Sequence, residues 1–162
     1  MALITALTGM IPDLQHEYHT VTLDTLGQSS ANTFTCYLQH PLKNVVQARL
    51  LAARINTTSA TEHCHVSIRE LDTIFSDRAS DVPNGQASES IVRNSFASIV
   101  SDGTGIIGFR DDYPIVTQYI DPIRSIDRFT VTIRNQSGVP IVPGASANNF
   151  FVIRFVCRKP NL

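Results

Sequence analysis

The sequence of 162 residues has no tryptophan, only two methionines and only two lysines. Its three cysteines, Cys36, Cys64 and Cys157, lie far apart and form no CxxC pair. This spacing fits neither a disulfide framework nor a zinc site, so we expect three buried thiols in a chain made in a reducing cytosol. The chain also has no run of about 18 apolar residues, which excludes a membrane-spanning helix, and no basic start typical of a signal peptide.

The sequence also has no excess of positive or negative charge, since it contains 13 Lys+Arg and 14 Asp+Glu. A protein that coats nucleic acid needs excess positive charge to neutralise phosphates, so we expect no nucleic-acid partner. Val, Ile and Thr, in contrast, total 44 residues against 11 Leu, and this bias favours extended backbone. Arginine outnumbers lysine 11 to 2, and the planar guanidinium suits interfaces better than open surface.

Eight segments are predicted as β-strands, joined by connectors rich in Gly, Asn, Ser and Pro. They are Tyr18–Leu26, Asn32–Gln39, Asn44–Ile55, His63–Leu71, Ser90–Val100, Pro114–Ile120, Arg128–Arg134 and Asn149–Cys157. Only Leu71–Arg78 could form a short helix, so the strand–helix alternation of a parallel sheet is absent. We predict one all-β domain over residues 1–162, an eight-stranded antiparallel single jelly roll, which is a two-sheet sandwich.

Three of these strands carry particular expectations. In Arg128–Arg134, Phe129, Val131 and Ile133 alternate with polar residues and should form one row facing the core. In Asn149–Cys157 both faces are largely apolar, which predicts a central strand covered on both sides. Asn44–Ile55 contains Ala and Leu that would also suit a helix, but its neighbours are strands and no capping pattern precedes it.

No motif indicates catalysis, a cofactor or a metal. Gly103–Gly108 spells GxGxxG, but Pro114 would end any helix after it, so we expect a flexible or tightly turned loop and no nucleotide site. His63 and His65 share a strand face without a third ligand, and Cys64 between them points the other way. No serine lies in a GxSxG motif. We therefore expect a protein that is not an enzyme.

Several segments together resemble the single jelly-roll capsid proteins, penton or minor capsid, of large eukaryotic DNA viruses, virophages and polinton-like viruses. Phe34–Val45 resembles the family's strand followed by a loop ending in Leu-x-Asn-Val, and His65–Leu71 its next strand. Asp121–Val131 carries a proline and an Ile-Asp-Arg step before the penultimate strand. A turn at Gln136–Pro140 and the hydrophobic strand Phe150–Cys157 follow. The resemblance covers residues 18–157, and the connectors are too short for the insertion domain that penton proteins often carry.

The resemblance implies a structural protein located in the virion and made in the host cytoplasm. The expected role is a penton, a homopentamer at the icosahedral vertices flanked by a major capsid protein of the double jelly-roll type. Alternatives are a minor capsid or cement protein between major capsid trimers, and a trimeric receptor-binding jelly roll. No catalytic residue is implied.

A ring of identical subunits needs two different patches on each subunit, and charged residues are the candidates for them. We expect interface contacts from Arg110, Arg124 and Arg128. Their acidic partners would come from the long connectors, at Asp72, Asp77, Asp81, Asp111 and Asp112. The apolar start of the chain has no place among the eight strands, so residues 1–15 are expected to form an arm that is buried on a neighbouring subunit or beneath the shell.

Overall fold

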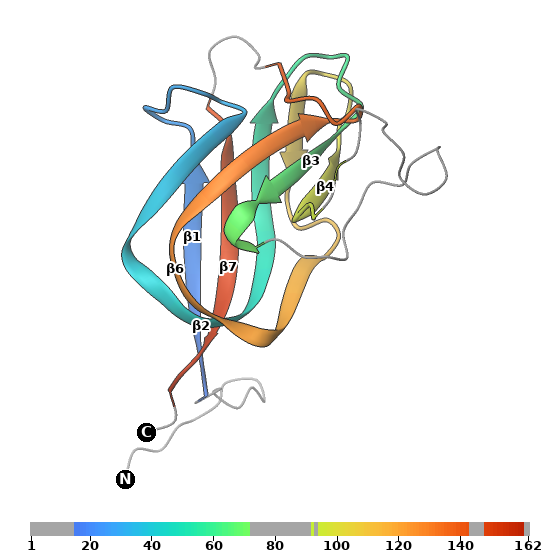
Figure 1. The fold of residues 1–162 in the computed structure, drawn as a ribbon. Helices are drawn as coiled ribbons and strands as arrows, with labels where there is room; N and C mark the ends of the chain where they lie inside the picture. The colour runs from blue at the N-terminus through green and yellow to red at the C-terminus, as the bar shows by residue number, and fades with distance from the viewer. Residues whose placement is uncertain (1–14, 72–91, 93, 143–147, 161–162) are drawn as a thin grey trace, which may run out of the picture.

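The computed structural model describes residues 15–71, 92, 94–142 and 148–160. These residues form seven strands and one short 3₁₀ turn, η2, at Arg69–Leu71 (Figure 1). The strands are β1 (His16–Asp24), β2 (Thr33–Asn56), β3 (His63–Ile68), β4 (Ala97–Val100), β5 (Ile106–Phe109), β6 (Ile115–Asn135) and β7 (Phe150–Arg158). All pairings are antiparallel, and the order is β1-β7-β2-β6-β3-β4, with β5 also paired to β2. The predicted all-β, antiparallel class is confirmed.

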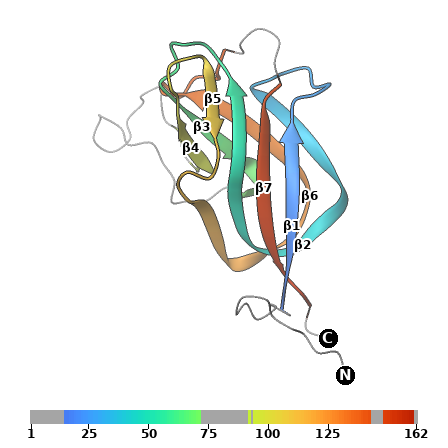
Figure 2. The same ribbon diagram turned by 180° about the vertical axis from the view of Figure 1, so that it is seen from behind.

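Two strands are long because each continues through a bend. In β2, residues 38–41 lie between the paired residues Tyr37 and Leu42, and in β6 residues 119–122 lie opposite the single residue Val46. These bulges contain Pro41 and Pro122, which have no N–H to give to a ladder and are tolerated where the ladder is interrupted. Figures 1 and 2 show both strands turning back at the same end of the molecule.

The bends give each long strand different neighbours along its length. Residues 45–54 of β2 pair with β7, whereas residues 33–37 pair with residues 128–132 of β6. Residues 131–135 of β6 pair with β3, and β3 pairs in turn with β4. We call one part of the sheet the β1–β7 half; it consists of the whole strands β1, β5 and β7 together with residues 45–56 of β2 and residues 115–118 of β6. We call β3, β4, β2 residues 33–37 and β6 residues 128–135 the β3–β4 half. The sheet curls so that the buried faces of the halves approach each other.

The core lies inside this curl and is rich in phenylalanine. Phe129, Val131 and Ile133 are fully buried, as the alternation in their strand predicted. The ring of Phe129, from the β3–β4 half, stacks on Phe155 of β7 with 5.2 Å between centroids. Phe34 and Phe151 make a second contact of this kind at 6.5 Å. Aromatic rings at these separations contribute beyond the area that they bury.

The strand count differs from the prediction in two ways. The predicted strands 32–39 and 44–55 are one strand, β2, and those at 114–120 and 128–134 are one strand, β6. The segment 44–55 is extended rather than helical, as expected. The connector predicted at 101–113 is a turn only as far as Gly105, because Ile106–Phe109 forms β5 against β2, with Ile107 and Phe109 buried.

Three predicted boundaries are also wrong. The first strand begins at His16 and ends at Asp24, whose carboxylate accepts a hydrogen bond from the Leu26 amide and starts a turn. The strand predicted at 63–71 ends at Ile68, where η2 begins. Of the strand predicted at 90–100 the structure describes residues 92 and 94–100, and among these only Ala97–Val100 form a strand, because Asn94 has a φ of 58°, which lies outside the extended region. The helix considered at 71–78 lies, beyond Leu71, outside the described residues.

A buried polar cluster joins the connections at the end of the sheet opposite the bends. The carboxamide of the fully buried Asn149 accepts a hydrogen bond from the Asn56 amide at 2.7 Å and donates to the Ala31 carbonyl at 2.9 Å. Its backbone amide donates to the Thr25 hydroxyl at 3.0 Å. One side chain therefore bonds both a buried amide at the end of β2 and a partly buried carbonyl between β1 and β2.

Candidate interaction surface

The structure separates the five predicted interface residues into two places. Arg110, Asp111 and Asp112 form the connection between β5 and β6, and all three are exposed. Arg124 and Arg128 are exposed farther along β6. Arg128 lies opposite Tyr37, in the part of β2 that belongs to the β3–β4 half. The two groups therefore lie on different parts of the curled sheet, and Asp72, Asp77 and Asp81 lie outside the described residues.

Asp111 already has a partner within the chain. Its carboxylate receives two hydrogen bonds from the Arg49 guanidinium on β2, at 2.7 and 3.3 Å. A bidentate contact of this kind holds a guanidinium in a fixed orientation. A second pair, Arg128 with Asp127 at 3.4 Å, joins two exposed side chains and contributes little to stability. Arg110, Asp112 and Arg124 make no ion pair within the described residues.

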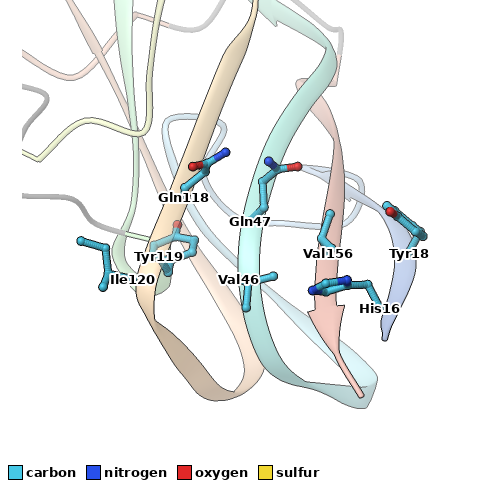
Figure 3. Close-up of a pocket in the computed structure, with 8 residues that line it drawn as sticks. All are labelled: His16, Tyr18, Val46, Gln47, Gln118, Tyr119, Ile120 and Val156. Atoms are coloured by element: carbon cyan, nitrogen blue, oxygen red, sulfur yellow. The ribbon is translucent and has the colours of Figure 1, made fainter. Parts of the chain in front are cut away.

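The sequence prediction missed a hollow on the outer face of the β1–β7 half. It has a volume of about 410 Å³ and is lined by side chains from β1, β2, β6 and β7 (Figure 3). The lining residues are His16, Tyr18, Val46, Gln47, Gln118, Tyr119, Ile120 and Val156. At its edges Ile120 is 99% exposed and Tyr18 is 60% exposed. Large apolar side chains that are this open are frequent at protein interaction sites.

The two apolar faces of β7 differ in burial. One face, with Phe151, Ile153 and Phe155, is buried in the core as predicted. The other face carries Val152 and Val156, which stay partly exposed because no described element covers them. The predicted central position of β7 is confirmed, because β7 lies between β1 and β2, whereas within the described residues its outer face is not covered.

The outer face of the β3–β4 half has a different character. Threonines fill the paired rows of β2 and β6, with Thr33 opposite Thr132 and Thr35 opposite Thr130. Glu70 of η2 accepts hydrogen bonds from the Thr130 amide at 2.6 Å and from its hydroxyl at 2.9 Å, which fixes the turn against this face. The same face also carries Tyr37, which is 74% exposed and lies opposite Arg128. The hollow is the stronger candidate for recognition because its exposed side chains surround a concave surface.

The histidines considered as metal ligands lie within the sheet, and the glycine motif considered as a nucleotide site begins in a loop. The His63 and His65 rings meet edge to face at 5.1 Å, and Nδ1 of the buried His65 lies 2.9 Å from the Ser98 hydroxyl. In the described ranges no three His, Cys, Asp or Glu side chains are grouped as a metal site requires. In the loop at 101–105, Gly103 and Gly105 both have a φ of 83°, and the Gly105 carbonyl accepts a hydrogen bond from the Thr57 amide.

Cys64 is expected to resist alkylation in the folded protein. Burial raises the pKa of its thiol to about 12, so at about pH 8 roughly one molecule in ten thousand carries the reactive thiolate. Iodoacetamide should modify Cys64 about a thousandfold more slowly in the native protein than in denaturant. Mass spectrometry of the peptides measures both rates, with Cys36, which is only partly buried, as the internal comparison. Equal native and denatured rates at Cys64 would contradict its burial.

The part of the chain that the structure describes contains no helix long and apolar enough to cross a membrane. No model of a known protein family matches the chain. No curated protein matches its sequence either.

Proposed function

We propose that this protein is a structural capsid protein, a penton that forms a homopentamer at the icosahedral vertices of a DNA virus. The observation that carries the proposal is the pairing pattern of the two bent strands. If β2 and β6 are each counted as two strands joined across a bend, the strand neighbours within the β1–β7 half and within the β3–β4 half are those expected for the two sheets of a jelly roll, which supports the proposal. The likeness of residues 18–157 to single jelly-roll capsid proteins supports the same assignment.

The distribution of charged residues supports a ring. A closed ring of identical subunits requires a head-to-tail contact between two different patches. Arg110 and Asp112 lie in the connection that precedes β6, and Arg124 and Arg128 lie after its bend. Asp112 has no ion-pair partner in the described part of the chain and is exposed. It is therefore free to meet an arginine of the next subunit.

Light scattering on the purified protein should give the mass of a pentamer, and averaging of particle vertices should show the same symmetry. We expect Asp112→Arg to shift the protein toward monomers, because it places like charges at the contact. Combining it with Arg124→Asp or Arg128→Asp should restore the pentamer in at least one pair. Arg69→Asp, in η2, is the matched charge change outside both patches.

Other assembly states would contradict the penton assignment in different ways. A trimer in solution and on the particle would indicate a receptor-binding jelly roll. A monomer located between major capsid trimers would indicate a minor capsid or cement protein.

A further inference from the structure

The hollow on the β1–β7 half contains a straight row of side chains across four strands. Tyr18 pairs with Val156, Val156 with Gln47, and Gln47 with Gln118, on β1, β7, β2 and β6 in turn. Neighbouring strands are about 4.8 Å apart, so the row spans roughly 14 Å. An extended peptide rises about 3.3 Å per residue, so about four of its residues match this length.

The centre of the row can bond to a peptide backbone. The carboxamides of Gln47 and Gln118 lie at the same level on neighbouring strands (Figure 3) and have no hydrogen-bond partner among the described side chains. Each offers an N–H donor and a C=O acceptor. A peptide unit offers the same two groups in complement, so two carboxamides on adjacent strands can hold an extended chain without reading its side chains.

The charges next to the row favour an acidic occupant. Arg154 of β7 lies one row away, paired with Thr20 on one side and with Arg49 on the other. Asp111 binds Arg49 and leaves Arg154 without a carboxylate partner in the described chain. Arg158 follows on the same face of β7. An uncompensated guanidinium beside a groove is a site for a carboxylate, which it can bind through two parallel hydrogen bonds.

The apolar part of the hollow favours a protein over a sugar. Val46 and Val156 line the hollow, and Ile120 extends from its edge. These aliphatic surfaces suit an aliphatic side chain, and covering them would also bury the second apolar face of β7. Among the described residues no carboxylate lines the hollow to accept bonds from sugar hydroxyls.

We propose that this row is the docking site for an extended segment of a partner protein, in which an aliphatic residue and an aspartate or glutamate lie within about four positions. The backbone of the segment bonds to Gln47 and Gln118, its aliphatic side chain packs on Val46 and Val156, and its carboxylate meets Arg154. In the proposed virion the segment belongs to a neighbouring capsid protein, and only that identification rests on the proposed function.

Selection from a random peptide library on the full-length protein tests the inference. Enriched peptides should combine an acidic and an aliphatic residue at this spacing, and a synthetic peptide of the most enriched sequence should bind in calorimetry. Gln47→Ala with Gln118→Ala, and separately Arg154→Ala, should each weaken this binding about tenfold or more. Thr132→Ala, on the other outer face, is the matched control and should leave the affinity unchanged. Unchanged melting temperatures establish that the variants are folded.

The inference is overturned if no peptide is enriched, if the enriched peptides lack a carboxylate, or if the glutamine and arginine variants leave binding intact. Binding of an oligosaccharide in place of peptides would overturn it as well. The outcomes are separate from those for the proposed function. A pentamer that enriches no peptide removes only the docking site, and a monomer that enriches the expected peptides removes only the penton.

Discussion

Val131→Asp is expected to yield insoluble or unfolded protein. Val131 is fully buried in β6, where its partners on the two sides are Phe34 of β2 and Ile68 of β3. A carboxylate at this position would have no charge partner or water, which costs several kcal/mol. A domain of this size is stable by about 5–15 kcal/mol in total, so one substitution removes much of the margin. The soluble fraction after expression and the circular dichroism of any soluble protein measure the effect.

The neighbouring substitution Thr132→Asp is the matched control. Thr132 lies on the opposite face of β6, partly exposed, between Thr33 and Ser67. A carboxylate there stays hydrated, so the variant should fold with a stability close to that of the natural protein. If both variants fold equally well, the register of β6 is wrong.

Asn149→Leu is expected to lower the free energy of unfolding by about 2–5 kcal/mol. Leucine branches at the same carbon but is larger, and it cannot bond to the Asn56 amide or to the Ala31 carbonyl, so a buried amide and a partly buried carbonyl would each lose a partner. Urea unfolding measures the change as a lower midpoint with an unchanged slope.

Asn148→Leu serves as the control for this experiment, because Asn148 is exposed and takes part in the cluster only through its backbone carbonyl. Its midpoint should stay close to that of the natural protein. Equal midpoints for the two variants would mean that the buried carboxamide does not hold the connections together.

The alternation of apolar residues predicted the core well where a strand runs straight. Phe129, Val131 and Ile133 are an example, because a period of two identifies one face regardless of what packs on it. The predicted strands stop before Pro41 and Pro122 and resume after them, whereas β2 and β6 continue through both prolines. A bulge accommodates proline within a strand, and bulges depend on pairing with a strand distant in sequence. The four-residue β5 was missed because the glycines around it favour a loop.

The candidate surface was less predictable than the core. The hollow combines residues that are far apart in the sequence, such as Tyr18, Gln47 and Val156, and their proximity follows from strand order alone. One signal was present in the sequence, namely the second apolar face of β7. The partner of Asp111 was not foreseeable, because Arg49 lies 62 positions earlier and the turn at Asp111 brings them together. The arginine surplus indicated an interface without indicating which face carries it.

The pairing of β1 sets a condition on the order of folding during synthesis. In the described chain the hydrogen-bonded neighbour of β1 is β7, so the described strand that is synthesised first pairs with the one that is synthesised last. At about 5–20 residues per second, roughly 6 to 25 s pass between the synthesis of Asp24 and that of Phe150. During this interval the apolar residues Val21 and Leu23 have no sheet to join. Nascent chains that stall before residue 150 should therefore depend on chaperones far more than chains that are released complete.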